Sequence, residues 1–519
     1  MNVLRTLLVL LALLIAAPAR AEWWEAKTDH FIVLSQSSSR EARDFAEKLE
    51  RFDMSLRSLQ NIKLSPVTSD SQRLTVYRFG DIGDIGRLAG SSGVAGFYIP
   101  RAGGSVAFVP AREEIKSNIK SIGARNQLDS QTVLFHEYAH HFMFQHFSGA
   151  YPGWYVEGLA ETYSTIDFKP DGSFHLGNPP QARAEALMGG LNFSAQRLLT
   201  NTNKPDMMDI YGRYTVGWLL THYLTFEPSR SGQLGNYLKL INSGTDPTVA
   251  ARQAFGDLDK LNRDIQSYKN KQVPGALVRP ANYRTPTVQM RRLAADEEAI
   301  IRIQMRSKRG VTRKTAPDVA ADARGIAAKI PQSYVVQLAS AEAELDAERY
   351  NEAEAAADRA IALNPRSVEA LLYKGRAYLE RGKSDPRQLA AARTWFTKAN
   401  QIDRDHAGPL FHNYMTYFKA GGPIPESTLI GLERAFELAP FDAEVRMVLG
   451  RQLLAEKKGK LARSVIIPFA LAPHESKGAK ALREVIDLID GNKVDEAYTK
   501  IAAEMERQEK IAKTGKDDD

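Results

Sequence analysis

A recurring pattern of paired helices in the second half of the chain most narrows the folds open to this sequence. Between residues 331 and 505, small and apolar residues recur at helical spacing, and turns interrupt the pattern. Leu-x-Pro ends close two of the expected helices, and their leucines, Leu363 and Leu438, lie 75 residues apart. A third, looser end, "FALAP", closes at Pro473. Helical hairpins that cannot bury their faces singly must stack, so we expect an all-α solenoid here.

This segment resembles tetratricopeptide repeats, whose units of about 34 residues are helix–turn–helix hairpins. The unit ends "AIALNP" and "AFELAP" carry the resemblance, together with Tyr373, Gly375 and Ala377 in the helix that opens the next unit. The resemblance implies a solenoid with a concave groove that recruits a protein partner or a substrate. The alternatives are a nonspecific helical bundle, or a spacer that only stabilises the rest of the chain.

Residues 22–272 have a different order, in which strands come before helices. The strand patterns are "HFIVLS", "RLTVYRF" and the hairpin "GFYIPRAGGSVAFVP", with its turn at residues 102–104. Helical patterns follow, up to about Gln272. This order predicts an α+β domain.

Two histidines four residues apart mark the first of two helices that carry chemistry. In "FHEYAHH", His136 and His140 lie one turn apart on one helix face, where their imidazoles can converge on a metal ion. Glu137 lies beside them and can act as general base for a water held by that metal. The alternative is a helix whose histidines make ordinary hydrogen bonds in the core. His141 and His146 fit that alternative better.

A third ligand would separate these interpretations, because zinc in hydrolases usually takes three protein ligands. Downstream, "PGWYVEGLAETY" carries Glu157 and Glu161 four residues apart among apolar neighbours. One carboxylate can bind zinc, and the other can orient a histidine ligand through its ring N–H. The alternative is a solvated acidic face.

Together, "HEYAH" and "WYVEGLAETY" resemble the gluzincin zinc metallopeptidases, which include thermolysin-like and aminopeptidase-like enzymes. The resemblance implies Zn²⁺ ligands at His136, His140 and Glu157. It also implies that Glu137 is the base and proton shuttle, and that Glu161 supports the ligands from behind. The fold that it implies is an α+β zincin-like metallopeptidase domain.

A tyrosine in "YTVGWLLTHYL" extends the resemblance to the aminopeptidase-like members, in which such a residue stabilises the oxyanion. On that match Tyr214 donates a hydrogen bond to the tetrahedral intermediate. Tyr211, one turn earlier, is the competing candidate, and core packing is the alternative role for Tyr214.

The sequence differs from the aminopeptidase-like pattern at two places. Sixteen residues separate His140 from Glu157, slightly fewer than is usual there, and no Gly-x-Met-Glu-Asn segment binds a free amine. Aminopeptidase activity is therefore not expected. The predicted hairpin can still offer a strand edge to an extended peptide.

The first residues predict export. Residues 1–21 have an early arginine, an apolar run and a small-x-small end, which is typical of a signal peptide cleaved after Ala21. The chain has no cysteine, so disulfides and a lipid-modified cysteine are excluded. We expect a periplasmic or secreted protein with no transmembrane segment after cleavage.

Two further segments look irregular. Residues 273–330 are expected to form a basic, Pro-containing linker, and residues 506–519 a charged, disordered tail. Much of the net charge of +7 lies between Pro286 and Thr315, which suggests a solvated connector or contact with an anionic envelope surface. Nucleic acid binding is not expected, because no recognition motif is present.

The sequence thus predicts an exported zinc peptidase that hydrolyses peptide bonds with a water activated by Glu137. Its substrate is a peptide or protein, and its repeats recruit a substrate or a protein partner. Two alternatives remain: a non-catalytic periplasmic scaffold on a metallopeptidase fold, and a zinc amidase that acts on cell-wall peptide.

Overall fold

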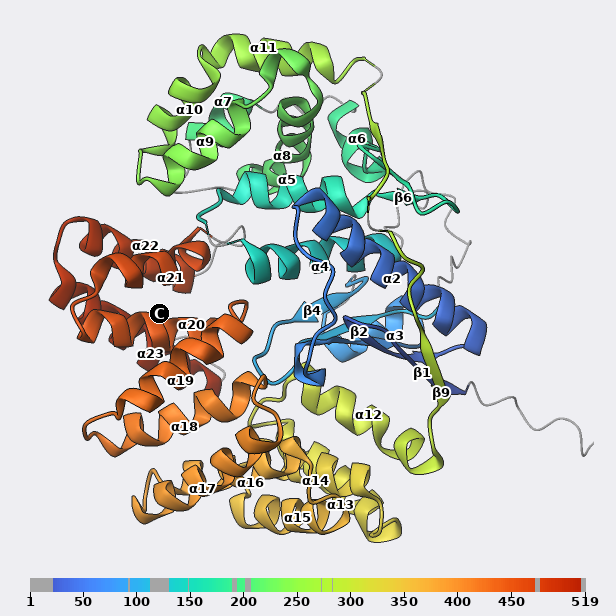
Figure 1. Cartoon of the computed structure of the whole chain (residues 1–519), viewed down its shortest axis with the longest axis vertical. Coiled ribbons are helices and arrows are strands. Elements are labelled where there is room, and N and C mark those ends of the chain that lie inside the picture. Colours follow the sequence, from blue (N-terminus) through green and yellow to red (C-terminus); the bar gives the residue numbers. More distant parts are fainter. Residues whose placement is uncertain are drawn as a thin grey trace, which may run out of the picture.

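The chain has a mixed α/β N-terminal part and an entirely helical C-terminal part, as the sequence predicts (Figure 1). The computed structural model describes residues 22–91, 94–112, 130–147, 149–188, 194–200, 207–271, 273–281, 283–471 and 477–514. The expected signal peptide lies outside these residues. Within them, no helix combines the length and the apolar character needed to cross a membrane.

A six-stranded sheet lies at the centre of the N-terminal part. Its strands are β1 (Trp23–Lys27), β2 (Phe31–Gln36), β3 (Leu74–Arg78), β4 (Phe97–Ile99), β5 (Val106–Val109) and β9 (Gln289–Arg292), in the spatial order β4-β5-β3-β2-β1-β9. β2, β3 and β5 are parallel, whereas β1 pairs antiparallel with both β2 and β9. β4 and β5 pair antiparallel, which confirms the predicted hairpin and leaves β4 at the edge of the sheet.

Helices cover both faces of this sheet, because alternate side chains of each strand point to opposite sides. On β5, Ala107 and Val109 join one core, while Phe108 joins the other. The helices over the first core are α2 (Ser39–Leu59) and α4 (Ser130–His146), and those over the second are α3 (Ile82–Ala89) and α12 (Ala295–Arg309). Helix α4, which contains the histidine motif, is thus packed directly on the sheet.

A second group of helices lies beyond α4. It contains α5 (Gly153–Ser164), α6 (Gln181–Met188), α7 (Ala195–Thr200), α8 (Met207–Phe226), α9 (Gln233–Asn242), α10 (Pro247–Phe255) and α11 (Leu258–Tyr268). A small sheet of β6 (Asp167–Phe168), β7 (Phe174–Leu176) and β8 (Ala276–Val278) lies beside them. The predicted order of strands before helices is therefore confirmed for most of this part.

Two glycines let α5 and α8 approach each other closely. A Cβ atom at Gly158 would lie 2.3 Å from the carbonyl oxygen of Gly217, and one at Gly217 would lie 2.6 Å from that of Trp154. Backbone therefore meets backbone at this crossing. The close approach brings the first half of α8 beside the motif residues of α5.

The C-terminal part consists of consecutive helices that pack on their neighbours. They are α13 (Ala316–Lys329), α14 (Tyr334–Asp346), α15 (Tyr350–Leu363), α16 (Val368–Arg381), α17 (Arg387–Ile402), α18 (Ala407–Ala420), α19 (Glu426–Leu438), α20 (Ala443–Ala455), α21 (Gly459–Ala470), α22 (Lys477–Asp490) and α23 (Val494–Thr514). The Leu-x-Pro pattern predicts two helix ends correctly, since α15 ends at Leu363 and α19 at Leu438. Two helical hairpins, α16–α17 and α18–α19, lie between Leu363 and Leu438.

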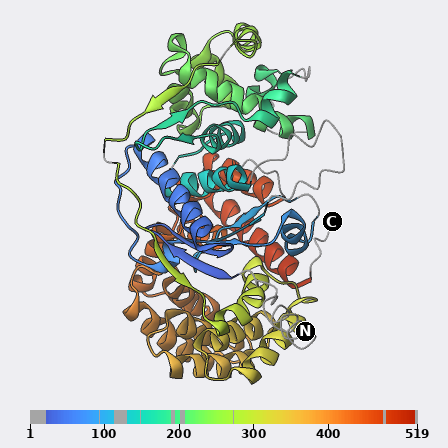
Figure 2. The same cartoon turned by 90° about the vertical axis from the view of Figure 1, so that its right-hand side faces the viewer.

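The C-terminal helices curve below and beside the N-terminal part (Figures 1 and 2). One hydrophobic core contains buried residues of both parts, from Ala26 to Ile501. The ring of Phe441 lies 4.5 Å from that of His141, and the ring of Phe469 lies 5.0 Å from that of Phe144. The C-terminal helices therefore pack directly on α4.

Residues 273–330 are not a linker, which corrects the expectation from the sequence. They contain β8, which completes the small sheet, and β9, which extends the large sheet beside β1. Helix α12 then covers a sheet face, and α13 packs on α12 and α14. The many prolines and charges of this segment concealed short strands, whose partners are far away in the sequence.

Most basic side chains of this segment are exposed, as expected of a solvated surface, and several of them pair with carboxylates. Arg291 pairs with Glu25 and Glu297, and Lys308 pairs with Glu342 at 2.8 Å. Residues 506–519 were expected to be a disordered tail, but α23 continues through them to Thr514. Only residues 515–519 of the expected tail lie outside the described residues.

The contact between α5 and α8 can be tested with Gly217→Ala. The added methyl group would overlap the Trp154 carbonyl, so we expect the free energy of unfolding to fall by about 1–3 kcal/mol or more in denaturant titrations. Gly235→Ala on α9 is the matched control, because its Cβ would meet no atom within 4 Å. In the control, the free energy of unfolding should be unchanged or slightly higher. Equal effects of the two changes would contradict tight packing at Gly217.

Candidate metal centre

The two motif helices bring three predicted ligands together. His136 and His140 lie one turn apart on α4, and Glu157 lies on α5, which packs against α4. On the opposite side of α4, the ring of Phe135 stacks on that of Phe52 at 4.0 Å between centroids. Packing against the sheet and α2 thus directs the two imidazoles toward α5.

The three ligand atoms form a tight triangle. The Nε2 atoms of His136 and His140 lie 3.0 Å apart. The Oε2 atom of Glu157 lies 3.1 Å from Nε2 of His136 and 3.4 Å from Nε2 of His140. Glu157 has no exposed surface, and His140 is also buried.

This triangle fits a zinc ion. Ligands held tetrahedrally at about 2.0–2.2 Å from zinc lie roughly 3.3 Å from one another. The donor set of two imidazoles and one carboxylate is also a common one for catalytic zinc. The residues of the triangle therefore satisfy both the distances and the chemistry of such a site.

The charges of the site also favour a divalent cation. Three carboxylates, Glu137, Glu157 and Glu161, act electrostatically on Tyr214, together with the single guanidinium of Arg183. Histidine ligands bind metal in their neutral form. Among the groups that act on Tyr214, carboxylates then outnumber the guanidinium, and a Zn²⁺ ion would reduce this excess of negative charge.

The pKa values of the ligands reflect the same attraction. Burial lowers the pKa of His136, but the hydrogen bond and the charge of Glu157 outweigh it and raise this pKa to about 9. Burial would raise the pKa of Glu157, but His140 and His136 hold it well below its usual range. The same convergence of imidazoles and carboxylate that favours a bound proton also suits a metal cation in its place.

Glu161 lies behind the ligands, where the sequence predicts it. Its Oε1 atom is 3.8 Å from Nδ1 of His136 and accepts a hydrogen bond of 2.8 Å from Nε of Arg183. A carboxylate near the second ring nitrogen of a ligand can fix the orientation of that ring. Glu161 is therefore held in place by Arg183 and close to His136.

Arg183 is a residue that the sequence analysis missed. It lies on α6, and its Cζ atom is 5.0 Å from the centre of the Tyr214 ring. Its surroundings in the sequence, "PPQARAEALM", contain no motif that distinguishes it from a surface arginine. Only the packing of α6 against α8 brings it to the site.

Tyr214 lies next to the ligands. Its ring is 6.1 Å from that of His136, with 24° between the ring planes. Burial, and then the charges of Glu157 and Glu137, raise the pKa of the phenol, so it keeps its proton at neutral pH. Tyr211, the competing candidate, lies one turn earlier on α8 and is 36% exposed.

Glu137 lies close enough to the edge strand β4 for its charge to act on Tyr98. Burial, and then the charges of Asp442 and Glu137, raise the pKa of Tyr98 on β4. The Tyr98 hydroxyl is hydrogen-bonded at 2.6 Å to Nδ1 of His141, one turn after Glu137 on α4. The charge of the predicted base therefore acts both on His136 in the triangle and on Tyr98 in β4.

His141 and His146 do not take part in the triangle. His141 contacts Tyr98 and Phe441, and burial lowers its pKa to about 3. His146 packs beside Phe142. His141 is therefore a buried histidine, as the sequence favours, whereas His146 is only half-buried.

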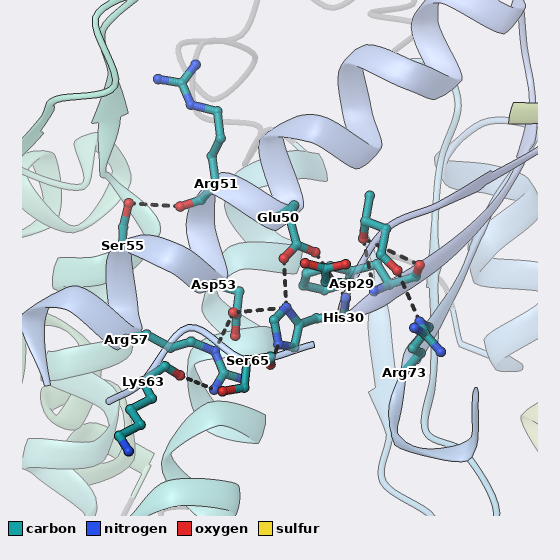
Figure 3. A network of polar contacts seen from close by, with 12 residues as sticks. Asp29, His30, Glu50, Arg51, Asp53, Ser55, Arg57, Lys63, Ser65 and Arg73 are labelled. Carbon is teal, nitrogen blue, oxygen red and sulfur yellow. Dashed lines mark hydrogen bonds and ion pairs between the residues drawn. The ribbon is translucent and has the colours of Figure 1, made fainter. Parts of the chain in front are cut away.

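A second group with metal-ligand chemistry lies on the other side of α4 (Figure 3). Nδ1 of His30 is 2.7 Å from Glu50 and 3.3 Å from Asp53, and Nε2 of His30 is 3.0 Å from the carbonyl oxygen of Ser65. Since both ring nitrogens face acceptors, both must donate, and His30 is an imidazolium.

The contacts of this second group form an ion-pair network. Arg57 donates to Asp53 at 2.5 Å, and the hydroxyl of Tyr138 donates to the same carboxylate at 2.7 Å. The two cations, His30 and Arg57, balance the two carboxylates. The network joins α2 to α4 through Tyr138, which follows Glu137 in the sequence.

Comparison with known proteins adds no family. No protein-family model matches this chain, and no curated protein is similar to it. The functional argument therefore rests on the site itself.

The charge of His30 can be tested through the pH dependence of stability. Burial lowers the pKa of His30, but Asp53 and Glu50 outweigh it and raise it overall. This stabilisation is complete below the unfolded pKa of about 6.5 and is lost as pH rises through the higher folded value. His30→Gln should cost about 3–5 kcal/mol of unfolding free energy near about pH 6, and less near about pH 9.

His146→Gln is the control for this experiment. Burial, and then the charge of Arg57, lower the pKa of His146 to about 4, so this side chain is neutral at both pH values. Its substitution should have the same effect on unfolding at each pH. A cost of His30→Gln that does not shrink toward alkaline pH would show that His30 is uncharged.

Proposed function

We propose that this protein is a zinc-dependent peptidase of the gluzincin type that hydrolyses peptide bonds. One observation carries the proposal: Nε2 of His136, Nε2 of His140 and Oε2 of Glu157 lie within 3.4 Å of one another, among carboxylates and largely buried. Two imidazoles and a carboxylate at such distances leave one position of a tetrahedral zinc site open, as catalysis requires.

The fold is compatible with this proposal. A mixed sheet with an antiparallel edge strand beside the motif helix is what a zincin-like domain would need. The helical hairpins from α14 to α23 are compatible with tetratricopeptide-like repeats. We also propose export to the periplasm or the exterior, on the signal-peptide pattern of residues 1–21.

The residues around the triangle can carry out the proton transfers of hydrolysis. Zinc, when bound, supplies Lewis-acid polarisation of the scissile carbonyl and of the attacking water. Glu137 takes the proton from that water and passes it to the leaving amine. Tyr214, which keeps its proton, donates a hydrogen bond to the oxyanion that develops on the carbonyl.

Arg183 supports two of these roles at once. Its hydrogen bond fixes Glu161 near His136, and its guanidinium lies over the ring of Tyr214. The Arg183 charge also opposes the rise in the Tyr214 pKa that burial and the carboxylates cause. Arg183 thereby makes the phenol a better donor to a developing negative charge.

The edge strand β4 gives the proposed substrate a place to bind. Among the described residues β4 pairs only with β5, so its other edge offers backbone N–H and C=O groups. An extended peptide that adds to this edge lies beside α4 and Glu137. We therefore propose a peptide or protein as substrate. Recruitment of a separate protein partner by the repeats stays a prediction.

The metal site can be tested by elemental analysis of the purified protein. We expect about one zinc per chain in the parent and a loss of zinc in Glu157→Ala, because this carboxylate is one of the three ligands. Glu137→Gln should keep the zinc but lose about 10²–10⁴-fold of casein hydrolysis, since it removes the base and no ligand. A parent without zinc, even after incubation with the metal, would overturn the peptidase proposal.

The oxyanion role can be tested with Tyr214→Phe and a matched control, Tyr211→Phe. Loss of the Tyr214 hydroxyl should lower kcat by about 10²–10³-fold while the zinc content is unchanged. Tyr211→Phe, one turn away on the same helix, should keep nearly parental kcat. A larger loss in the control than in Tyr214→Phe would reverse the assignment.

A further inference from the structure

The edge strand β4 is held to α4 by a tyrosine. The hydroxyl of Tyr98 is hydrogen-bonded to Nδ1 of His141 at 2.6 Å, and their rings meet edge to face at 5.4 Å. His141 lies four residues after Glu137 on the same helix, so both side chains lie on one face of α4. This contact sets the distance between the strand and the helix that carries the base.

The same strand is held to the C-terminal helices just after its end. The backbone N–H of Ala102, in the β4–β5 turn, donates to Oδ2 of Asp442 at 2.7 Å. The other oxygen of Asp442 accepts a hydrogen bond of 3.0 Å from the N–H of Val445 and so caps α20. One carboxylate therefore fixes the hairpin to the start of a helix 340 residues away in the sequence.

The residue before Asp442 completes the contact. Phe441 is 4% exposed, and its ring lies 4.5 Å from that of His141. The corner between α19 and α20, residues 439–442, thus touches both His141 and the turn that follows β4. We call this segment the α19–α20 corner.

We propose that the α19–α20 corner is a positioning element of the proposed active site. It holds the edge of β4 at the distance from α4 and Glu137 that catalysis requires. The proposal rests on the proposed peptidase function. It gives the C-terminal helices a role within the chain itself, in addition to any recruitment. A substrate that adds to β4 is then placed by a strand anchored at Tyr98 and at Ala102.

The chemistry of the anchor supports a positioning role. A hydrogen bond from a backbone N–H to a carboxylate is stronger and shorter than one between neutral groups. It acts on the backbone of the turn, so it restrains the whole strand rather than one side chain. Because a misplacement of about 1 Å can cost about a hundredfold in rate, a restraint of this kind matters for catalysis.

Asp442→Asn tests the proposal with little disturbance. The amide keeps one oxygen, which can serve either Ala102 or Val445, and turns an N–H₂ group toward the other N–H. Asp405→Asn is the matched control, because Asp405 accepts a hydrogen bond of 2.7 Å from Thr68. It also joins the C-terminal helices to the N-terminal part, but at a loop before β3 rather than at β4.

Three measurements decide the outcome: zinc content, hydrogen exchange at the Ala102 amide, and KM and kcat for a short and an extended casein peptide. In Asp442→Asn, zinc content should be unchanged and exchange at Ala102 should rise about tenfold. The KM for the extended peptide should rise about tenfold while that for the short peptide is unchanged. Asp405→Asn should match the parent in every measurement.

Other results would overturn the proposal. An unchanged KM for the extended peptide, despite faster exchange at Ala102, would show that the anchor does not place the substrate. Loss of zinc in Asp442→Asn would show a general structural role instead. If the parent hydrolyses no peptide, the peptidase function fails on its own, and unchanged exchange at Ala102 in Asp442→Asn would then overturn the anchor as well.

Discussion

A carboxylate without exposed surface, Glu157, sets the main physical constraint on this structure. A buried charge is costly unless other charges or a metal compensate it, so the surrounding elements must supply partners at close range. Helix α4 supplies two imidazoles, and the glycine contact between α5 and α8 brings Tyr214 beside them. The sheet, α2 and the C-terminal helices in turn hold α4 in place from other sides.

The sequence predicts the parts of this arrangement that depend on local spacing. Residues four apart on a helix share a face, so His136 and His140 could be paired from the sequence alone. The buried surroundings of Glu157 were visible in the apolar residues next to it. The Leu-x-Pro ends at Leu363 and Leu438 marked helix ends correctly, because a proline stops a helix within a few residues of its position.

The parts that escaped prediction depend on pairs far apart in the sequence. Arg183 has no local signal, since its importance comes only from the place where α6 meets α5 and α8. The strand β9 looked like a linker because its only strand partner among the described residues, β1, lies more than 250 residues earlier. The contact between Ala102 and Asp442 is also invisible to any short-range pattern.

The position of β9 also affects the order in which the chain can fold during synthesis. β1 is an inner strand of the finished sheet, with β2 on one side and β9 on the other. The first strand described therefore waits for residues 289–292 before its second edge is covered. Such distant pairings give a high contact order and slow folding, and they leave a strand edge open to other chains in the meantime. A newly made chain of this kind would benefit from a chaperone that binds extended segments until β9 emerges.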